Sequence, residues 1–334
     1  MLFRAKQDLS FFDSKQLYVE NAEIIVTQKC NLACAHCMRG NSCNKEISDE
    51  VIDAFFDKFI EFGNLSIGGG EPSLAVERIR RVLEIAKEKN ISVKALNVTT
   101  NAAVYNEDFA KVLLEWQDYV DYCLHEYPDG FGEGEFKISL RVSLDDFHII
   151  EIRKKYGLSI EQILDNIKKY QEILGAENVR ACYGADYELI DDGRASQYNG
   201  AVGKAKPITI SKFPYFEGKE GVLVGGIVVV GVDGEIVPVN TPFENERVLS
   251  LGNVLIDKTS AIMKRAKLIR TDSIKQYNDK NFKVFQGLGI RSNAVKRYHK
   301  SKRFQKRLYI EHLLRKRGQV LKEDYETFDF TQGK

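Results

Sequence analysis

The sequence lacks any long run of apolar residues. Its longest such stretch, residues 221–232, is too short and too rich in glycine to span a bilayer. The first residues, Met1-Leu-Phe-Arg-Ala-Lys-Gln-Asp, contain neither an apolar core nor a small-residue cleavage site, so they do not resemble a signal peptide. We therefore expect a cytoplasmic protein without a membrane span.

An excess of charge of either sign is also missing. The 334 residues include 49 Lys and Arg against 48 Asp and Glu, a net charge of +1. This balance argues neither for nor against an acidic partner such as nucleic acid. With 43% hydrophobic and 29% charged residues, the composition is that of an ordinary soluble globular chain. Its length suits one large domain, alone or with an extension.

Cysteine is scarce and unevenly placed. Three of the six cysteines lie within eight residues, Cys30-Asn-Leu-Ala-Cys34-Ala-His-Cys37, and none follows Cys182. This distribution does not suit a disulfide framework and fits a reducing compartment. Thiolates at this spacing on a short loop converge on one metal centre. An iron–sulfur cubane takes four cysteine ligands, so three leave one iron open to another ligand.

Strand and helix patterns alternate through the first half of the chain. Apolar, β-branched runs predict short strands at residues 23–27, 65–68, 92–99, 137–144 and 178–183. Amphipathic patterns with capping residues predict helices at residues 48–62, 74–89, 106–122 and 159–174. This order indicates an α/β fold with parallel strands. The cysteine loop follows the first strand directly, at the position where barrel enzymes carry their chemistry.

The last third of the chain differs in character. Residues 221–239 form two apolar runs around Asp233-Gly234, a strong β-hairpin signal. Residues 291–317 contain eleven Lys or Arg against one acid. We expect three parts in the chain. They are an N-terminal extension at residues 1–21, a barrel core at 22–210, and a C-terminal extension at 211–334 with the hairpin and a basic helical tail at 264–320.

A glycine segment, Gly68-Gly-Gly-Glu-Pro72, directly follows the second predicted strand. Successive glycines let the backbone approach a ligand closely and leave its carbonyl and amide groups accessible. Carbonyl groups at this position suit a ligand that carries an ammonium group. Pro72 is suited to opening the next helix.

Together, the cysteine spacing and the glycine segment resemble the radical S-adenosylmethionine (SAM) superfamily. Each motif follows a strand, in the family's order, and the resemblance covers residues 22–185. It implies a partial TIM-like (β/α)6 barrel. It also implies that Cys30, Cys34 and Cys37 hold a [4Fe–4S] cluster whose fourth iron is chelated by the amino and carboxylate groups of SAM.

The resemblance also assigns residues to SAM. The backbone around Gly68, with the carbonyls of Gly69 and Gly70 and with Glu71, is expected to receive the amino group. His36 precedes the third cysteine, a position that is usually aromatic in the family and lies near the adenine. These assignments follow from the matching motifs alone.

Further candidates come from the later strands. Ser143 and Asp145 match a serine–acid pair that often contacts the ribose or carboxylate of SAM. Thr100 and Asn101, at the end of the third predicted strand, resemble another segment of that pocket. If Cys182 points into the barrel, it is a candidate donor of a hydrogen atom or proton to a substrate radical.

The implied reaction begins with one-electron reduction of the cluster by a partner such as flavodoxin or ferredoxin. SAM is then cleaved, and a 5′-deoxyadenosyl radical abstracts hydrogen from a substrate. The protein's part in such chemistry is to position the substrate and exclude water. The substrate and the bond attacked stay open.

The C-terminal part is faintly similar to the SPASM/twitch extension of peptide-modifying members. It shares the hairpin, the segment Gly231-Val-Asp-Gly-Glu-Ile-Val-Pro238 and the tripeptide Leu251-Gly-Asn. Val239 stands where those members carry a cysteine, so we expect no auxiliary cluster there. The similarity favours a peptide or protein substrate. The basic residues 291–317 favour RNA or a nucleotide, unless they form a solvated amphipathic helix packed on the barrel.

The cysteines also have simpler interpretations. The clustered three suit a structural zinc knot with Cys43 or His36 as fourth ligand, which would make the protein a metal-binding interaction module. Cys43 suits a surface or packing position. Cys123 and Cys182 suit core packing, because free cysteine behaves as a small buried hydrophobe.

Several polar residues on the predicted strands also have two interpretations. Arg141 and Arg180 lie where an unpaired charge is costly, so they are either pocket ligands or members of buried ion pairs. Ser143 and Asp145 are alternatively simple strand-end residues. His148 has no partner that the sequence shows.

Overall fold

One large sheet forms the centre of the protein. The computed structural model describes residues 17–126, 137–183, 194, 215–217, 222–237, 239, 241–263 and 265. The strands are Leu17–Thr27 (β1), Phe59–Gly69 (β2), Ser92–Val93 (β3), Leu96–Thr100 (β4), Ile138–Leu144 (β5), Val179–Tyr183 (β6), Tyr215–Glu217 (β7), Val222–Val230 (β8), Glu235–Val237 (β9) and Gly252–Asn253 (β10). They are ordered β10-β9-β8-β1-β2-β4-β5-β6, with β3 beside β2 and β7 beside β8.

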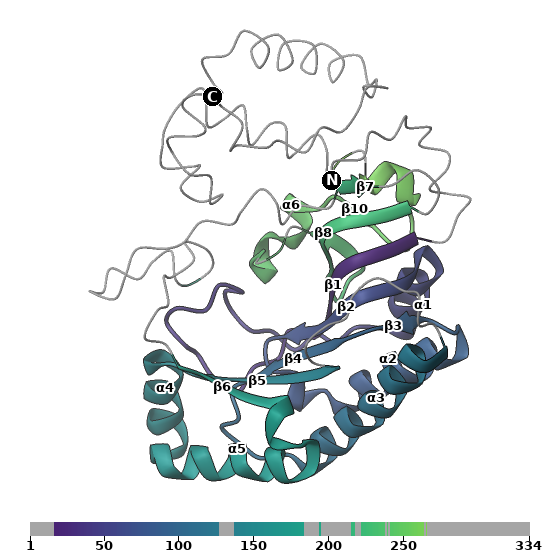
Figure 1. The fold of residues 1–334 in the computed structure, drawn as a ribbon. Coiled ribbons are helices and arrows are strands. Elements are labelled where there is room, and N and C mark those ends of the chain that lie inside the picture. Colours follow the sequence, from purple (N-terminus) through teal and green to yellow (C-terminus); the bar gives the residue numbers. More distant parts are fainter. Residues whose placement is uncertain are drawn as a thin grey trace, which may run out of the picture.

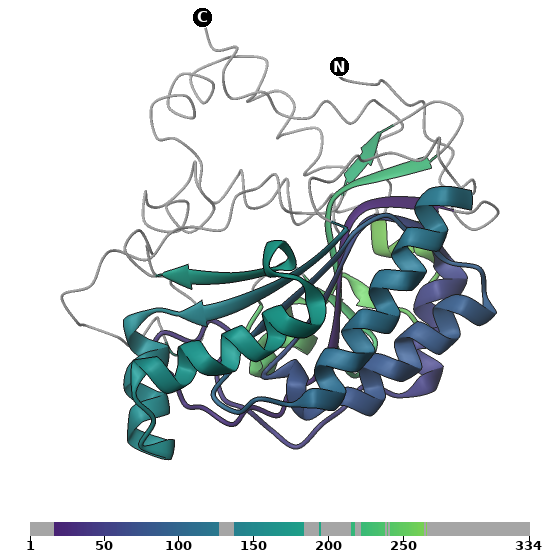
Figure 2. The same cartoon turned by 60° about the horizontal axis from the view of Figure 1, so that its bottom comes forward.

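The helices are Asp49–Lys58 (α1), Val76–Glu88 (α2), Glu107–Glu126 (α3), Asp146–Tyr156 (α4), Ile160–Leu174 (α5) and Glu246–Leu249 (α6), with single 3-10 turns at Pro72–Leu74, Ala176–Asn178 and Phe243–Asn245. Helices α1, α2, α3 and α5 cover one face of the sheet (Figures 1 and 2). Contacts join α1 to α2, α2 to α3 and α3 to α5, so these four helices form a continuous layer.

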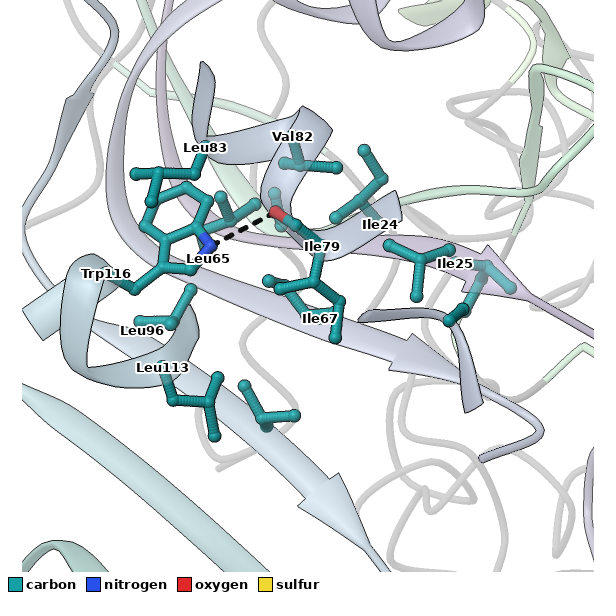
Figure 3. Close-up of a cluster of buried hydrophobic side chains, with 14 of the residues drawn as sticks. Ile24, Ile25, Leu65, Ile67, Ile79, Val82, Leu83, Leu96, Leu113 and Trp116 are labelled. Atoms are coloured by element: carbon teal, nitrogen blue, oxygen red, sulfur yellow. Dashed lines mark hydrogen bonds between the residues drawn. The ribbon is translucent and has the colours of Figure 1, made fainter. Parts of the chain in front are cut away.

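The core lies between this helical layer and the sheet (Figure 3). Leu65 and Ile67 of β2 are buried against Ile79 of α2 and Trp116 of α3. The Trp116 indole N–H donates to the Ile79 carbonyl at 3.4 Å, which satisfies the one polar atom of the ring. Each such apolar side chain contributes roughly 1.5–3 kcal/mol when fully buried. The opposite face of the same strands is left for polar side chains, because successive residues alternate between faces.

The expected α/β class is confirmed. Strands β1, β2, β4, β5 and β6 pair in parallel in chain order, with helices between them. The order begins at β10 and ends at β6, two strands that do not pair with each other, so the sheet is an open, partial barrel. Within the described residues, no helix is long and apolar enough to cross a membrane.

Three details of the predicted elements are wrong. The first helix ends at Lys58 rather than at residue 62, because Phe59 and Phe62 are fully buried in β2, which pairs with β1. The third predicted strand is divided into β3 and β4. Helix α4 was not predicted, because its sequence has no one-sided apolar stripe and it buries only Ile152.

The C-terminal part continues the same sheet. Strand β8 pairs in parallel with β1, and β9 returns antiparallel to β8, which confirms the predicted hairpin. Its turn uses Gly234 at φ +83°, in the left-handed region that glycine adopts without strain. The predicted basic residues 291–317 lie outside the described residues, as does most of the predicted tail at 264–320.

Candidate cofactor and substrate site

A cavity of about 420 Å³ opens on the face of the sheet that carries polar side chains. It brings together eleven of the predicted site residues: Cys30, Cys34, His36, Cys37, Gly68, Gly69, Gly70, Glu71, Thr100, Asn101 and Ser143. Asp145 and Cys182 are not in its wall. The prediction that these loops and strand ends converge is consistent with parallel strands, whose carboxyl ends meet at one edge.

The cysteine loop leads from β1 to the cavity in tight turns. The Cys37 amide donates to the Cys34 carbonyl at 3.2 Å, and the Gly40 amide donates to the Cys37 carbonyl at 3.3 Å. Cys34 is buried, whereas Cys30 and Cys37 are half-buried. The Leu32 amide points at the Cys30 sulfur at 3.4 Å. The three thiols therefore reach the cavity from one short, internally bonded loop.

The electrostatics of these thiols suit a metal centre. Burial, together with the neighbouring sulfurs of Cys30 and Cys37, raises the pKa of the Cys34 thiol to about 12. Burial also raises the pKa of the Cys30 thiol to about 11, with Glu71 and Cys37 adding to the increase. Thiolates held this way need a nearby cation. The donor set therefore fits an iron–sulfur or other thiolate-ligated centre.

The glycine segment packs against the cysteine loop itself. A Cβ on Gly69 would lie 2.6 Å from the Thr27 carbonyl oxygen, and one on Gly70 would lie 2.3 Å from the Lys29 carbonyl oxygen. The Gly70 amide donates to the Thr27 carbonyl at 2.9 Å. Within the described residues, no donor pairs with the Gly70 carbonyl. The glycines thus allow two loops to approach each other and leave a carbonyl at the cavity.

Glu71 braces the glycine segment against β4. Its buried carboxylate accepts from the Thr100 hydroxyl at 2.6 Å, the Asn101 amide at 2.8 Å and the Ser73 amide at 3.2 Å. The Asn101 side chain in turn donates to Asn31 of the cysteine loop at 2.7 Å. Three loops that carry predicted cofactor residues are therefore joined by one network.

Asp145 is occupied at the start of α4. One oxygen accepts from the amides of Phe147 and His148 as the N-cap, and the other lies 2.6 Å from His148 Nδ1. His36 Nε2 is 3.6 Å from the same carboxylate. Burial alone would raise the pKa of Asp145, but the hydrogen bonds from His148 and His36 hold it well below its usual range. Asp145 therefore orients two imidazoles.

His36 lies in the cavity wall with one nitrogen to spare. Its ring stacks on Phe147 at 4.5 Å between centroids, and its buried Nδ1 has no hydrogen-bond partner among the described residues. Ligand atoms of Cys34, His36 and His148 lie within 4.8 Å of one another. This trio is a different ligand set from that of the predicted zinc knot. Its ligand atoms are nevertheless close enough together to bind a single metal ion.

The remaining cysteines lie elsewhere. Cys43 is exposed, donates to the Gln28 side chain at 2.8 Å, and is not in the cavity wall. Cys123 is a residue of α3 and is buried in the core. Cys182 is half-buried on β6, in register with Ser143 of β5. Cys182 thus neighbours the site from the adjacent strand.

Two arginines at the site were not predicted. Arg194 follows a segment with no motif, and its side chain donates to the Cys34 carbonyl at 2.9 Å while its amide donates to the Cys37 carbonyl at 2.9 Å. Arg39 pairs with Glu23 of β1 at 2.6 Å. The sequence could have indicated a buried ion pair at Glu23, because this acidic residue lies in an otherwise apolar strand. No local pattern marks Arg194.

The C-terminal part closes one side of the site. Ile227 of β8 and Val239 line the cavity. The Phe243 amide donates to the Arg39 carbonyl at 2.9 Å, directly after the cysteines. Val239, which stands where the similar peptide-modifying members carry a cysteine, is thus part of the cavity wall.

Comparison with known proteins agrees with this arrangement. The radical SAM superfamily matches the chain over residues 24–175. The matched segment (the radical SAM domain) runs from β1 to the end of α5 and contains the cysteine loop, the glycine segment and Ser143. Members of this superfamily are enzymes that use SAM and an iron–sulfur centre.

Two curated relatives are similar to part of the chain. An uncharacterised protein of Methanocaldococcus jannaschii is 24% identical over 148 residues, 43% of this chain and 44% of that protein. A probable GTP 3′,8-cyclase of Archaeoglobus fulgidus is 37% identical over 101 residues, 29% of this chain and 32% of that protein. The chain thus matches less than half the length of either relative.

A solved structure is also similar at low level. The structure of Streptococcus suis SuiB bound to precursor peptide SuiA has a TM-score of 0.44 and 13% identity, covering 85% of this chain and 73% of SuiB. A TM-score of this size supports no statement about substrate. The function must therefore be argued from the cavity.

Proposed function

We propose that this protein is a radical SAM enzyme with one [4Fe–4S] cluster held by Cys30, Cys34 and Cys37. The observation that carries the proposal is the single cavity shared by these thiols, the Gly70 carbonyl and Ser143. When bound, the cluster and SAM supply a 5′-deoxyadenosyl radical that abstracts hydrogen from a substrate. A one-electron donor such as flavodoxin or ferredoxin and a cytoplasmic location belong to the same proposal.

The chain's own residues would bind and orient the cofactors. The Gly70 carbonyl faces no described donor and suits the ammonium group of SAM. His36 offers its unpartnered Nδ1 and a ring already stacked on Phe147, which suits a hydrogen bond and close packing with an adenine. Ser143 offers a hydroxyl on β5 for the ribose or carboxylate.

Anaerobic reconstitution with iron and sulfide tests this proposal. We expect a brown protein with about four irons per chain, as a cubane requires, that releases 5′-deoxyadenosine after reduction with SAM present. Cys34→Ser should lose both properties. Cys43→Ser is the matched control, because Cys43 is exposed and outside the cavity wall. SAM cleavage that survives Cys34→Ser would contradict the assignment.

A non-enzymatic alternative is a metal-binding interaction module. It rests on the trio Cys34, His36 and His148, whose ligand atoms lie within 4.8 Å of one another. Zinc prefers such mixed sulfur and nitrogen ligands. Metal analysis after anaerobic purification separates the two functions: stoichiometric zinc, lost in His148→Gln, supports the module, and iron with sulfide supports the enzyme.

For the substrate, we propose a peptide or protein. The extension that resembles those of peptide-modifying enzymes packs behind the cysteine loop, and Val239 within it lines the cavity. RNA or a nucleotide is the second candidate, because the chain is 37% identical over 101 residues to a probable GTP 3′,8-cyclase. The rate of 5′-deoxyadenosine release decides between them. It is measured with a random peptide library, with nucleoside triphosphates and with transfer RNA; stimulation confined to nucleotides or RNA rejects the peptide.

A further inference from the structure

We propose that the inner wall of the cavity contains a recognition site for a compact anionic group of the substrate, a carboxylate or a phosphate, with Arg141 as its principal ligand. Calling the bound molecule a substrate rests on the proposed function. The anion site itself rests on the arrangement of charges in the cavity.

Arg141 occupies the polar face of the sheet. It lies on β5, is exposed, and belongs to the cavity wall. Its neighbours in register are Thr99 on β4 and Arg180 on β6. Side chains at one register position of a parallel sheet project to the same face. A hydroxyl and a second guanidinium group are thus placed on either side of Arg141.

The carboxylates of the cavity wall are already engaged. Glu23 pairs with Arg39 at 2.6 Å, and Glu71 accepts from Thr100 and the Asn101 amide. Among the described residues, no carboxylate lies within the 4.0 Å that defines an ion pair with Arg141. The exposed guanidinium group of Arg141 is therefore left without a counter-ion among the described acids. The protein's described acids leave that role to a ligand.

The site is separate from the position expected for SAM. Arg141 precedes Ser143 by two residues on the same face of β5, and a strand rises about 3.3 Å per residue, so the two lie roughly 7 Å apart along the strand. Next to Arg141, the wall continues with Asn97 and Asn64, whose amides bond to each other at 2.5 Å. This stretch of the wall is therefore polar, which suits an anionic group beyond the end of SAM.

Isothermal titration of the reconstituted, SAM-bound protein tests the site. Inorganic pyrophosphate and succinate are the two probes, titrated at constant ionic strength; a preference between them tells a phosphate source from a carboxylate source. We expect saturable binding that Arg141→Gln weakens by about tenfold or more, as loss of a charge-assisted pair implies. Arg141→Lys should show intermediate affinity. Arg247→Gln is the matched control, because Arg247 is 80% exposed on α6 and outside the cavity wall.

Two results would overturn the inference. One is equal affinity of wild type, Arg141→Gln and Arg141→Lys for both probes, which would mean adventitious binding. The other is competition of the probes with SAM together with a parallel loss of SAM affinity in Arg141→Gln, which would make Arg141 a cofactor ligand. Near-ultraviolet circular dichroism confirms folding of each variant. The proposed function fails separately, through absent iron or absent 5′-deoxyadenosine in the wild type.

Discussion

Two buried carboxylates at the site bind groups of the protein itself. Glu71 accepts from Ser73, Thr100 and Asn101, and Asp145 caps α4 while it holds His148. An ionised carboxylate has about four acceptor positions, so three strong donors leave little capacity for a ligand. The assignment of both residues to SAM stays a prediction. Their observed partners indicate that they position the loops and imidazoles that would bind it.

Glu71→Gln should destabilise the protein. The new amide NH₂ would face either the Ser73 or the Asn101 backbone amide, donor against donor, and leave a buried group unpaired. We expect a loss of about 1–3 kcal/mol in the free energy of unfolding, measured by urea denaturation. Glu77→Gln, exposed on α2, should stay within about 0.5 kcal/mol of wild type. An unchanged urea midpoint for Glu71→Gln would show that the brace does not contribute.

The two sequence motifs form one structural element. The glycine segment after β2 and the cysteine loop after β1 are joined by the bonds from the Gly70 amide to Thr27 and from the Glu71 amide to Lys29. The absence of a Cβ at residues 69 and 70 permits this approach. The shape of the proposed cluster site therefore depends on the glycines as much as on the thiols.

Gly70→Ala should separate the two loops. Its Cβ would meet the Lys29 carbonyl at 2.3 Å and the Cys30 Cβ at 3.0 Å, so the backbone must shift, at a cost of about 1–3 kcal/mol. We expect reduced iron content after reconstitution as well as a lower melting temperature. Gly157→Ala is the control for stability alone. Gly157 has φ +68° and open space around an added Cβ, so alanine there costs about 1–2 kcal/mol of backbone strain without moving the site. Full iron loading in Gly70→Ala would contradict this account.

For the protein as a whole, the C-terminal part meets the radical SAM domain behind the cysteine loop. Glu246 of α6 is 3% exposed there, and one of its oxygens accepts from Gln28 at 3.2 Å. Its other oxygen is buried, and no residue that the structure describes forms a hydrogen bond with it. Burial raises the pKa of Glu246 to about 7, despite the nearby Arg39 guanidinium. This contact between distant segments therefore favours the protonated acid.

Glu246 should make stability depend on pH. In the unfolded chain a glutamate titrates near pH 4.3, so between about 4.3 and about 7 the folded protein keeps a proton that the unfolded chain has released. The free energy of unfolding should therefore fall as pH rises through this window, by up to about 3 kcal/mol, and then level off. Glu246→Gln should flatten the curve and be more stable than wild type at pH 8. The control is Glu244→Gln, because Glu244 is exposed; this variant should retain the wild-type dependence of stability on pH. A wild-type dependence in Glu246→Gln would contradict the prediction.

The residues that could be predicted share a local signal. The cysteine spacing, the glycine run and the caps of α1 and α5 each occupy a few consecutive residues, so local chemistry alone identifies them. Helix α4 could not be predicted from the sequence, because it buries only Ile152 and has no apolar stripe. The end of α1 at Lys58 could not be predicted either, because Phe59 and Phe62 suit a helix as well as a strand. Only the pairing of β2 with β1 places them in a strand.

Local sequence was sufficient to locate the thiols, the glycines and the alternating elements, because those features depend on neighbouring residues. Long-range packing was needed to bring Arg194 onto the cysteine loop, to pair Arg39 with Glu23, and to place β8 beside β1. It also brought His36 beside Asp145 and left Arg141 facing the cavity. Such contacts join residues far apart in the chain, where no spacing or periodicity relates one to the other.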